Sequence, residues 1–109
     1  MSNKPISQLS VSSTAGYDAT IIIYTSAGTP YTLTPHVTYN KTQSFDLSGV
    51  GGLQDGDMFN VGVTTGRGAI AVDNTTTLIY NSASKFAGAY TVSGTAVAPT
   101  ITFDGVQPI

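Results

Sequence analysis

Apolar and polar positions alternate along the chain in short runs, which is the pattern of half-buried β-strands. The clearest run covers residues 31–39. Its apolar parity consists of Tyr31, Leu33, Val37 and Tyr39. We expect these side chains to face a core, and His36 and the threonines between them to face solvent. Pro35 has no N–H donor, so this run is predicted to lie at a sheet edge or to carry a bulge.

The remaining strands are predicted from shorter patterns. Residues 21–24 form a continuous apolar run, Ile-Ile-Ile-Tyr, which predicts a strand buried on both faces within residues 19–25. The segment from Ser26 to Pro30 contains Gly28 and is predicted to close a hairpin. Further strands are predicted around Leu9 and Val11 and at residues 44–47, 58–64, 69–72, 76–80, 87–92 and 97–103.

Eight or nine short strands, about ten residues apart and without helical segments between them, predict an all-β domain. We favour an antiparallel two-sheet β-sandwich, with a small closed barrel as the alternative. The composition agrees, because the chain contains no Glu and only four Lys and Arg, so strong helix formers are scarce. No repeat or linker interrupts the sequence, and residues 1–109 are therefore predicted to form a single domain.

Charge and apolar content exclude several classes of partner. A net charge of −2, with four cationic side chains in 109 residues, does not supply the basic surface that nucleic acid requires. No apolar run approaches the length of a membrane span, and residues 1–13 lack the basic and apolar regions of a signal peptide. We expect a soluble chain, and no compartment is indicated. With no Cys, disulfides and thiolate metal sites are excluded.

Catalysis is not expected, because groups that titrate near neutral pH are almost absent. The chain has one His, His36, and its acids are six Asp. Ser44 and Asp46 lie near His36 in the sequence, but no nucleophile elbow accompanies them. We expect His36 on the solvent face of a strand, and we predict no catalytic residue and no organic cofactor.

A calcium ion is the one cofactor that the sequence leaves open. Asp55 and Asp57 flank Gly56 in the glycine-rich segment of residues 48–57. Calcium takes carboxylate and carbonyl oxygens from such loops. Asp73 and Asn74 would complete the ligand set if the loops meet at one end of the sandwich. The alternative is an ordinary turn without a metal ion, because two Asp residues with a Gly between them are also common in turns.

Tyrosines, amides and hydroxyls dominate the remaining polar chemistry, and this is the chemistry that holds sugars. Most of the six Tyr share parity with core positions, so Tyr17 and Tyr24 are the rings expected to be accessible. The main hypothesis is a non-enzymatic, lectin-like module that recognises carbohydrate or a cell-surface glycan. Its predicted ligand-binding residues lie at loop tips: Tyr17, Asp18, Asp55, Asp57, Asp73 and Asn74.

Self-assembly is the alternative function. A weakly charged sandwich rich in Thr, Ala and Gly suits a subunit that packs on copies of itself, as in virion decoration or fibre proteins. In that case the terminal segments, residues 1–8 and 106–109, would exchange or add strands. A homo-oligomer is expected in either case. A third possibility, a surface-binding hydroxyl array, would rest on Thr32, Thr34 and Thr38 alone.

The second half of the chain carries one resemblance. The strand pattern Gln43-Ser44-Phe45-Asp46-Leu47, the glycines between residues 52 and 56, and the closing pattern Ala89-Tyr90-Thr91-Val92-Ser93-Gly94-Thr95 stand in this order. In these features the chain resembles a group of small single-domain bacterial all-β proteins. The resemblance implies a compact sandwich and implies no active-site residue.

Overall fold

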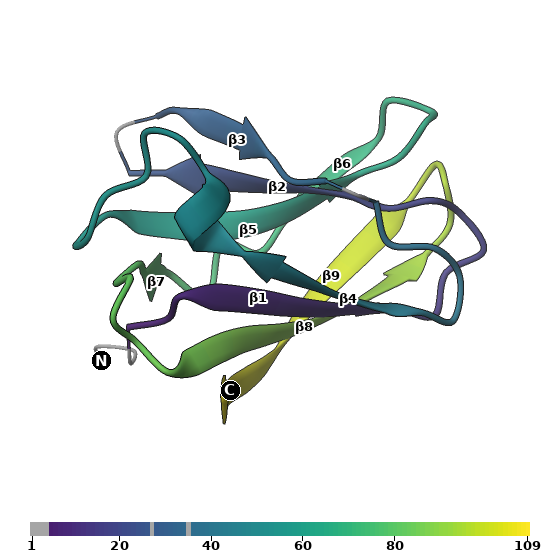
Figure 1. Cartoon of the computed structure of the whole chain (residues 1–109). Coiled ribbons are helices and arrows are strands. Elements are labelled where there is room, and N and C mark those ends of the chain that lie inside the picture. The colour runs from purple at the N-terminus through teal and green to yellow at the C-terminus, as the bar shows by residue number, and fades with distance from the viewer. Residues whose placement is uncertain (1–4, 27, 35) are drawn as a thin grey trace.

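Two β-sheets packed face to face make up the structure, a computed structural model that describes residues 5–26, 28–34 and 36–109 (Figure 1). The strands are β1 (Gln8–Ser13), β2 (Thr20–Thr25), β3 (Pro30–Thr32), β4 (Thr42–Asp46), β5 (Met58–Thr64), β6 (Ile70–Val72), β7 (Leu78–Ile79), β8 (Phe86–Gly94) and β9 (Pro99–Pro108). A short 3₁₀ helix, η1 (Leu47–Gly49), follows β4. The all-β prediction and the sandwich are confirmed, and the sheets do not close into a barrel.

The first sheet has the strand order β4-β1-β8-β9. Its outer pairs are antiparallel, but β1 and β8 run parallel. This central pair departs from the fully antiparallel sheet expected from the sequence. It is possible because the whole second sheet is threaded between β1 and β8 in the chain, which provides the long connection that parallel neighbours need.

The second sheet has the order β3-β2-β5-β6, and β7 pairs with the start of β5. Within it, β2 alternates between buried and partly exposed side chains, which is the pattern of a strand with one buried face. Ile21 and Ile23 are fully buried, whereas Ile22 and Tyr24 are partly exposed on the outer face. The prediction that β2 is buried on both faces is therefore wrong, because the described residues form two sheets and the side chains of Ile22 and Tyr24 face away from the layer between them.

The predicted strand over residues 31–39 is correct only at its beginning. After β3 the chain leaves the sheet and crosses to the other layer, as Figure 1 shows. Leu33 and Val37 are still buried, and Val37 forms an isolated bridge with Ala19. Tyr39, which was expected in the core, is 63% exposed because the crossing segment no longer keeps one parity inward. The edge position is confirmed for β3, while Pro35 lies outside the described residues.

The C-terminal segment belongs to the fold. β9 runs through Val106, which lies opposite Gly88 of β8, so residues 106–108 are paired within the chain. These residues thus add to a strand of their own chain, and an exchange of this segment between copies stays a prediction. Residues 1–4 of the corresponding N-terminal arm lie outside the described residues. Val97, the first residue of the strand predicted over residues 97–103, instead lies in the turn before β9 and is 71% exposed.

The two lateral sides of the sandwich differ. On one side β9 packs against β5 and β6 of the opposite sheet, and we call this the closed side. On the other side lie β3 and β4, the outer strands of the two sheets, and the segment from η1 to β5 runs between the layers there (Figure 1). We call this the open side.

Among the described residues, none belongs to a helix with the length and apolar character of a membrane span.

Candidate functional site

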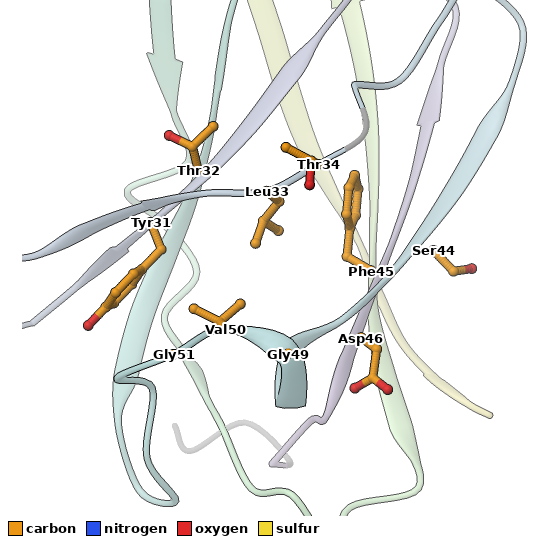
Figure 2. A pocket seen from close by; sticks show the side chains of 10 residues that line it. All are labelled: Tyr31, Thr32, Leu33, Thr34, Ser44, Phe45, Asp46, Gly49, Val50 and Gly51. Atoms are coloured by element: carbon orange, nitrogen blue, oxygen red, sulfur yellow. The ribbon is translucent and has the colours of Figure 1, made fainter.

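Two hollows on the open side share one aromatic side chain, Tyr31. The first, the edge hollow, has a volume of about 420 Å³ and lies between β3 and β4. It is lined by Tyr31, Thr32, Leu33, Thr34, Ser44, Phe45, Asp46, Gly49, Val50 and Gly51. Figure 2 shows Leu33, Val50 and Phe45 around its centre, while the side chain of Tyr31 lies at one end. The edge hollow thus has an apolar floor and polar walls.

The second hollow, which we call the loop hollow, has Tyr31 in common with the edge hollow and otherwise a different set of lining residues. Its volume is about 470 Å³. It is lined by Thr25, Ser26, Thr29, Tyr31, Gly52, Gln54, Gly56, Asp57 and Met58. These residues come from the β2–β3 hairpin and from the glycine-rich segment before β5. Both volumes fall within the range of small-molecule sites.

The β2–β3 hairpin places Tyr31 because its turn is held by local hydrogen bonds. Gly28 adopts a positive φ of 89°, which closes the turn. The Thr25 hydroxyl donates to the Thr29 carbonyl at 3.1 Å and accepts from the Thr29 N–H at 3.1 Å. Tyr31 follows two residues later as a partly exposed side chain of a strand whose register is fixed by pairing with Ile23.

A glycine is required beneath the Tyr31 ring. Gly52 has a φ of 97°, and a Cβ built on it would approach the Tyr31 hydroxyl oxygen to 2.8 Å. Any other residue at position 52 would therefore be strained in its backbone and would displace the ring. The glycine-rich segment that was predicted to be a loop accordingly has a packing role: it supports an aromatic ring at the surface.

The same segment is ordered by its own hydrogen bonds. The Asp46 carboxylate accepts from the N–H of Ser48 at 3.0 Å and from its hydroxyl at 2.8 Å, which caps η1. These two hydrogen bonds lower the pKa of Asp46. Further along, Asp57 Oδ2 accepts from the Gln54 N–H at 2.9 Å, and the Leu53 side chain is buried. Hydrogen bonds within the protein therefore hold part of the wall of each hollow.

Asp55 and Asp57, predicted together as ligand or calcium residues, have separate roles. Asp57 lines the loop hollow, whereas the Asp55 carboxylate accepts from the N–H and hydroxyl of Ser82, at 2.8 and 3.2 Å. In the described part of the chain, no group of three or more His, Cys, Asp or Glu side chains is arranged to hold a metal ion. Calcium at this loop stays a prediction.

The other predicted ligand residues lie elsewhere. The Tyr17 hydroxyl donates to the Ser93 carbonyl at 2.8 Å, and partial burial raises its pKa. Asp73 is 8% exposed, and its Oδ1 accepts from the N–H and hydroxyl of Thr75. Asp18 and Asn74 are exposed. Of the six predicted residues, only Asp57 lines either of the two hollows.

The sequence patterns missed Tyr31 because its parity marks it as a core residue. It is partly exposed because β3 is an outer strand and the chain departs from the sheet immediately after it. Pro30, which begins β3, is typical of an edge strand and was the available indication. His36 is exposed, and among the described residues no hydrogen bond joins it to Ser44 or Asp46.

No family model, curated protein or solved structure matches this chain. The resemblance of its second half to small bacterial all-β proteins therefore stays an expectation.

Proposed function

We propose that the protein is a non-enzymatic carbohydrate-binding module whose ligand lies across Tyr31, in the loop hollow and onto the edge hollow. The observation that carries this proposal is the partly exposed Tyr31 ring, seated on Gly52 and flanked on two sides by hollows with hydroxyl, amide and carboxylate groups. A sugar ring has an apolar C–H face and a fringe of hydroxyls. The Tyr31 ring can stack on the C–H face, and the polar groups of the hollows can hydrogen-bond to the hydroxyls.

The polar groups of the loop hollow support a neutral ligand. Gln54 contributes an amide, and Thr29 and Ser26 contribute hydroxyls, so the wall offers both donors and acceptors. Asp57 is the one charged side chain among the described residues of this hollow. One of its carboxylate oxygens is used by the Gln54 N–H, and the other accepts from a ligand hydroxyl. Among the described residues that line the two hollows none is cationic, and a neutral ligand therefore suits them better than a phosphorylated or strongly acidic one.

Two hollows on either side of one ring suit an extended chain of sugars. Each hollow is large enough for part of a small ligand, and Tyr31 belongs to both. We therefore expect an oligosaccharide to bind more tightly than its monosaccharide. Because the walls are held by hydrogen bonds within the protein, little ordering is required on binding.

The experiment is a neutral-glycan array probed with the labelled protein, followed by titration calorimetry with the best-binding oligosaccharide. We expect Tyr31→Ala to weaken binding about tenfold or more, because it removes the stacking face. Tyr31→Phe should retain most of the affinity, since the ring is kept. Tyr39→Ala is the matched control: Tyr39 is also an exposed tyrosine but lines neither hollow.

Thermal unfolding of each variant separates a lost site from a lost fold. Two results would overturn the proposal: no array glycan retained by the wild-type protein, or an affinity that Tyr31→Ala leaves equal to that of Tyr39→Ala.

A further inference from the structure

The outer strands of the two sheets differ in how they are protected from pairing with another chain. An outer strand exposes unpaired N–H and C=O groups. Prolines, bulges or a short length usually prevent such a strand from pairing with another chain. β9 begins at Pro99, ends at Pro108 and is interrupted by a register shift opposite Ala89 and Tyr90. β3 and β6 are three residues long, and β3 starts at a proline.

β4 has none of these devices. It is five residues long, Thr-Gln-Ser-Phe-Asp, with no proline, no glycine, no internal lysine and no register shift against β1. Its side chains alternate regularly, with Phe45 buried and Thr42, Ser44 and Asp46 exposed. Among the outer strands of the two sheets, it is the one that remains competent to accept another strand.

The hydrogen-bonding pattern identifies which groups β4 presents. Leu47 N–H donates to the Ser7 carbonyl at 3.0 Å, and Ser13 N–H donates to the Lys41 carbonyl at 3.0 Å. In an antiparallel pair the bonded positions recur every second residue. Residues 41, 43, 45 and 47 therefore bond to β1, and the N–H and C=O groups of Thr42, Ser44 and Asp46 point away from it. One of these, the Ser44 carbonyl, accepts from the Gln43 side-chain amide at 3.1 Å. This amide is exposed and can be replaced by a backbone N–H of a second strand.

The charges at the two ends of β4 favour a second copy in antiparallel orientation. Lys41 precedes the strand, Asp46 ends it, and both side chains are exposed. An antiparallel pair of β4 strands centred on Ser44 sets Thr42 opposite Asp46 and brings each Lys41 to the end where the partner's Asp46 lies. A parallel pair would instead place like charges together. The outward backbone groups of the two copies also match in this register.

We propose that β4 is a homodimerisation edge, at which two copies pair antiparallel about Ser44 and join their four-stranded sheets into one of eight strands. The twofold arrangement is closed, so it produces a dimer and not a fibre. The backbone supplies most of the contacts, as in other cases of strand addition. This inference is argued separately from the proposed carbohydrate function, but Ser44 and Asp46 also line the edge hollow, so a second copy paired on β4 would compete with a ligand there.

Sedimentation equilibrium of the full chain over a wide concentration range tests the proposal. We expect a concentration-dependent monomer–dimer equilibrium for the wild type. Ser44→Pro removes an N–H that points away from β1, so the monomer keeps its hydrogen bonds while the dimer loses two at its centre; we expect the dissociation constant to rise about tenfold or more. Lys41→Asp should also weaken the dimer, because it places carboxylates together, and the effect should shrink as salt is raised.

Ile70→Pro is the matched control. Ile70 lies on β6, its side chain is 58% exposed, and its N–H likewise points away from its partner strand, since the neighbouring Thr65 and Ala69 form the hydrogen-bonded pair. This variant should dimerise like the wild type. Amide hydrogen exchange gives a second readout, with slower exchange at Thr42, Ser44 and Asp46 at high protein concentration.

A monomer at all concentrations would overturn the proposal. So would a dimer that Ser44→Pro leaves intact, because a different surface would then hold it. Dimerisation that is lost equally in Ser44→Pro and Ile70→Pro would also count against it, since the loss would then follow from proline in any outer strand.

Discussion

The closed and open sides of the sandwich contain similar kinds of residues but differ in strand length and in how their strands pack. On the closed side β9, the longest strand, packs across β5 and β6. Within its own sheet, β9 also places the Phe103 ring against the Tyr90 ring of β8, at a centroid distance of 5.2 Å. On the open side the outer strands β3 and β4 are short, and a glycine-supported segment lies between the layers. Packing across the layers is thus concentrated on one side and accessible surface on the other.

Turns and side-chain hydrogen bonds reinforce this difference. Near the β8–β9 turn, the Thr65 hydroxyl donates to the Ala96 carbonyl at 2.6 Å, and the Tyr17 hydroxyl donates to the Ser93 carbonyl at 2.8 Å. Both bonds join segments far apart in the sequence. On the open side, the hydrogen bonds of the β2–β3 turn and of the η1 segment are mostly local. We therefore expect substitutions on the closed side to change stability and those on the open side to change binding.

The sharpest test makes the same substitution at two glycines with nearly the same backbone. Gly94 has a φ of 87° and Gly28 a φ of 89°. A Cβ on Gly94 would collide with the Ala98 carbonyl oxygen and lie 3.1 Å from Thr100 N, whereas nothing lies within 4 Å of one on Gly28. Gly94→Ala should lower the free energy of unfolding by about 3 kcal/mol or more, because backbone strain and a clash add.

Gly28→Ala carries the strain alone and should cost about 1–2 kcal/mol. Urea denaturation of the two variants measures the difference. Equal losses would mean that the β8–β9 turn relaxes as easily as the β2–β3 turn, and the contrast between the two sides would fail.

The layered fold was predictable because it depends on parity, which is a local property of the chain. Residues 58–64 were predicted as a strand with the bounds that β5 has, and their inward set of Phe59, Val61 and Val63 is fully buried. Parity fails where the chain leaves a sheet, as after β3, because alternation then no longer reports one face. It also does not reveal pairing partners, so the parallel β1–β8 neighbours were not foreseen.

The candidate site was harder to predict, because it forms where segments distant in the sequence meet. Asp57, which was predicted as a ligand-binding residue, lines the loop hollow, but Tyr31 of the same hollow comes from another hairpin and shows a core pattern. The contact between Gly52 and the Tyr31 ring could not be predicted, because the two residues lie in different segments of the chain. Asp73 illustrates the reverse error: it resembles a loop-tip ligand, yet its carboxylate is buried and bonded to Thr75.

A smaller change in the free energy of unfolding is expected on the closed side, where buried polar atoms lack hydrogen-bond partners. In the described part of the chain, two buried side-chain oxygens have no hydrogen-bond partner, Asp73 Oδ2 and Tyr90 Oη. Burial raises the pKa of Tyr90, and the Asp73 carboxylate adds to this, so the hydroxyl stays protonated. Tyr90→Phe removes an unsatisfied hydroxyl while keeping the ring against Phe103, and we expect the free energy of unfolding to rise by up to about 1 kcal/mol.

Chemical denaturation of Tyr90→Phe beside Phe103→Leu checks the assignment. The second variant disturbs the same ring pair and should destabilise the protein. A loss of about 1 kcal/mol or more in Tyr90→Phe would instead show that the hydroxyl is satisfied, for example by an internal water.

The smallest effect belongs to the open side, where Asp46 joins β4 to η1. Hydrogen bonds from Ser48 lower the pKa of this carboxyl below its ordinary value of 3.8. A depressed pKa means that the ionised group stabilises the fold at pH values above 3.8, and that this contribution is lost as the pH falls through the lowered pKa. Asp46→Asn keeps an oxygen that accepts from Ser48 but removes the charge. At neutral pH it should cost less than about 0.5 kcal/mol, because water screens an exposed carboxylate. The difference in melting temperature between the variant and the wild type should vanish in strong acid, whereas a difference that persists there would assign the effect to packing at the start of η1.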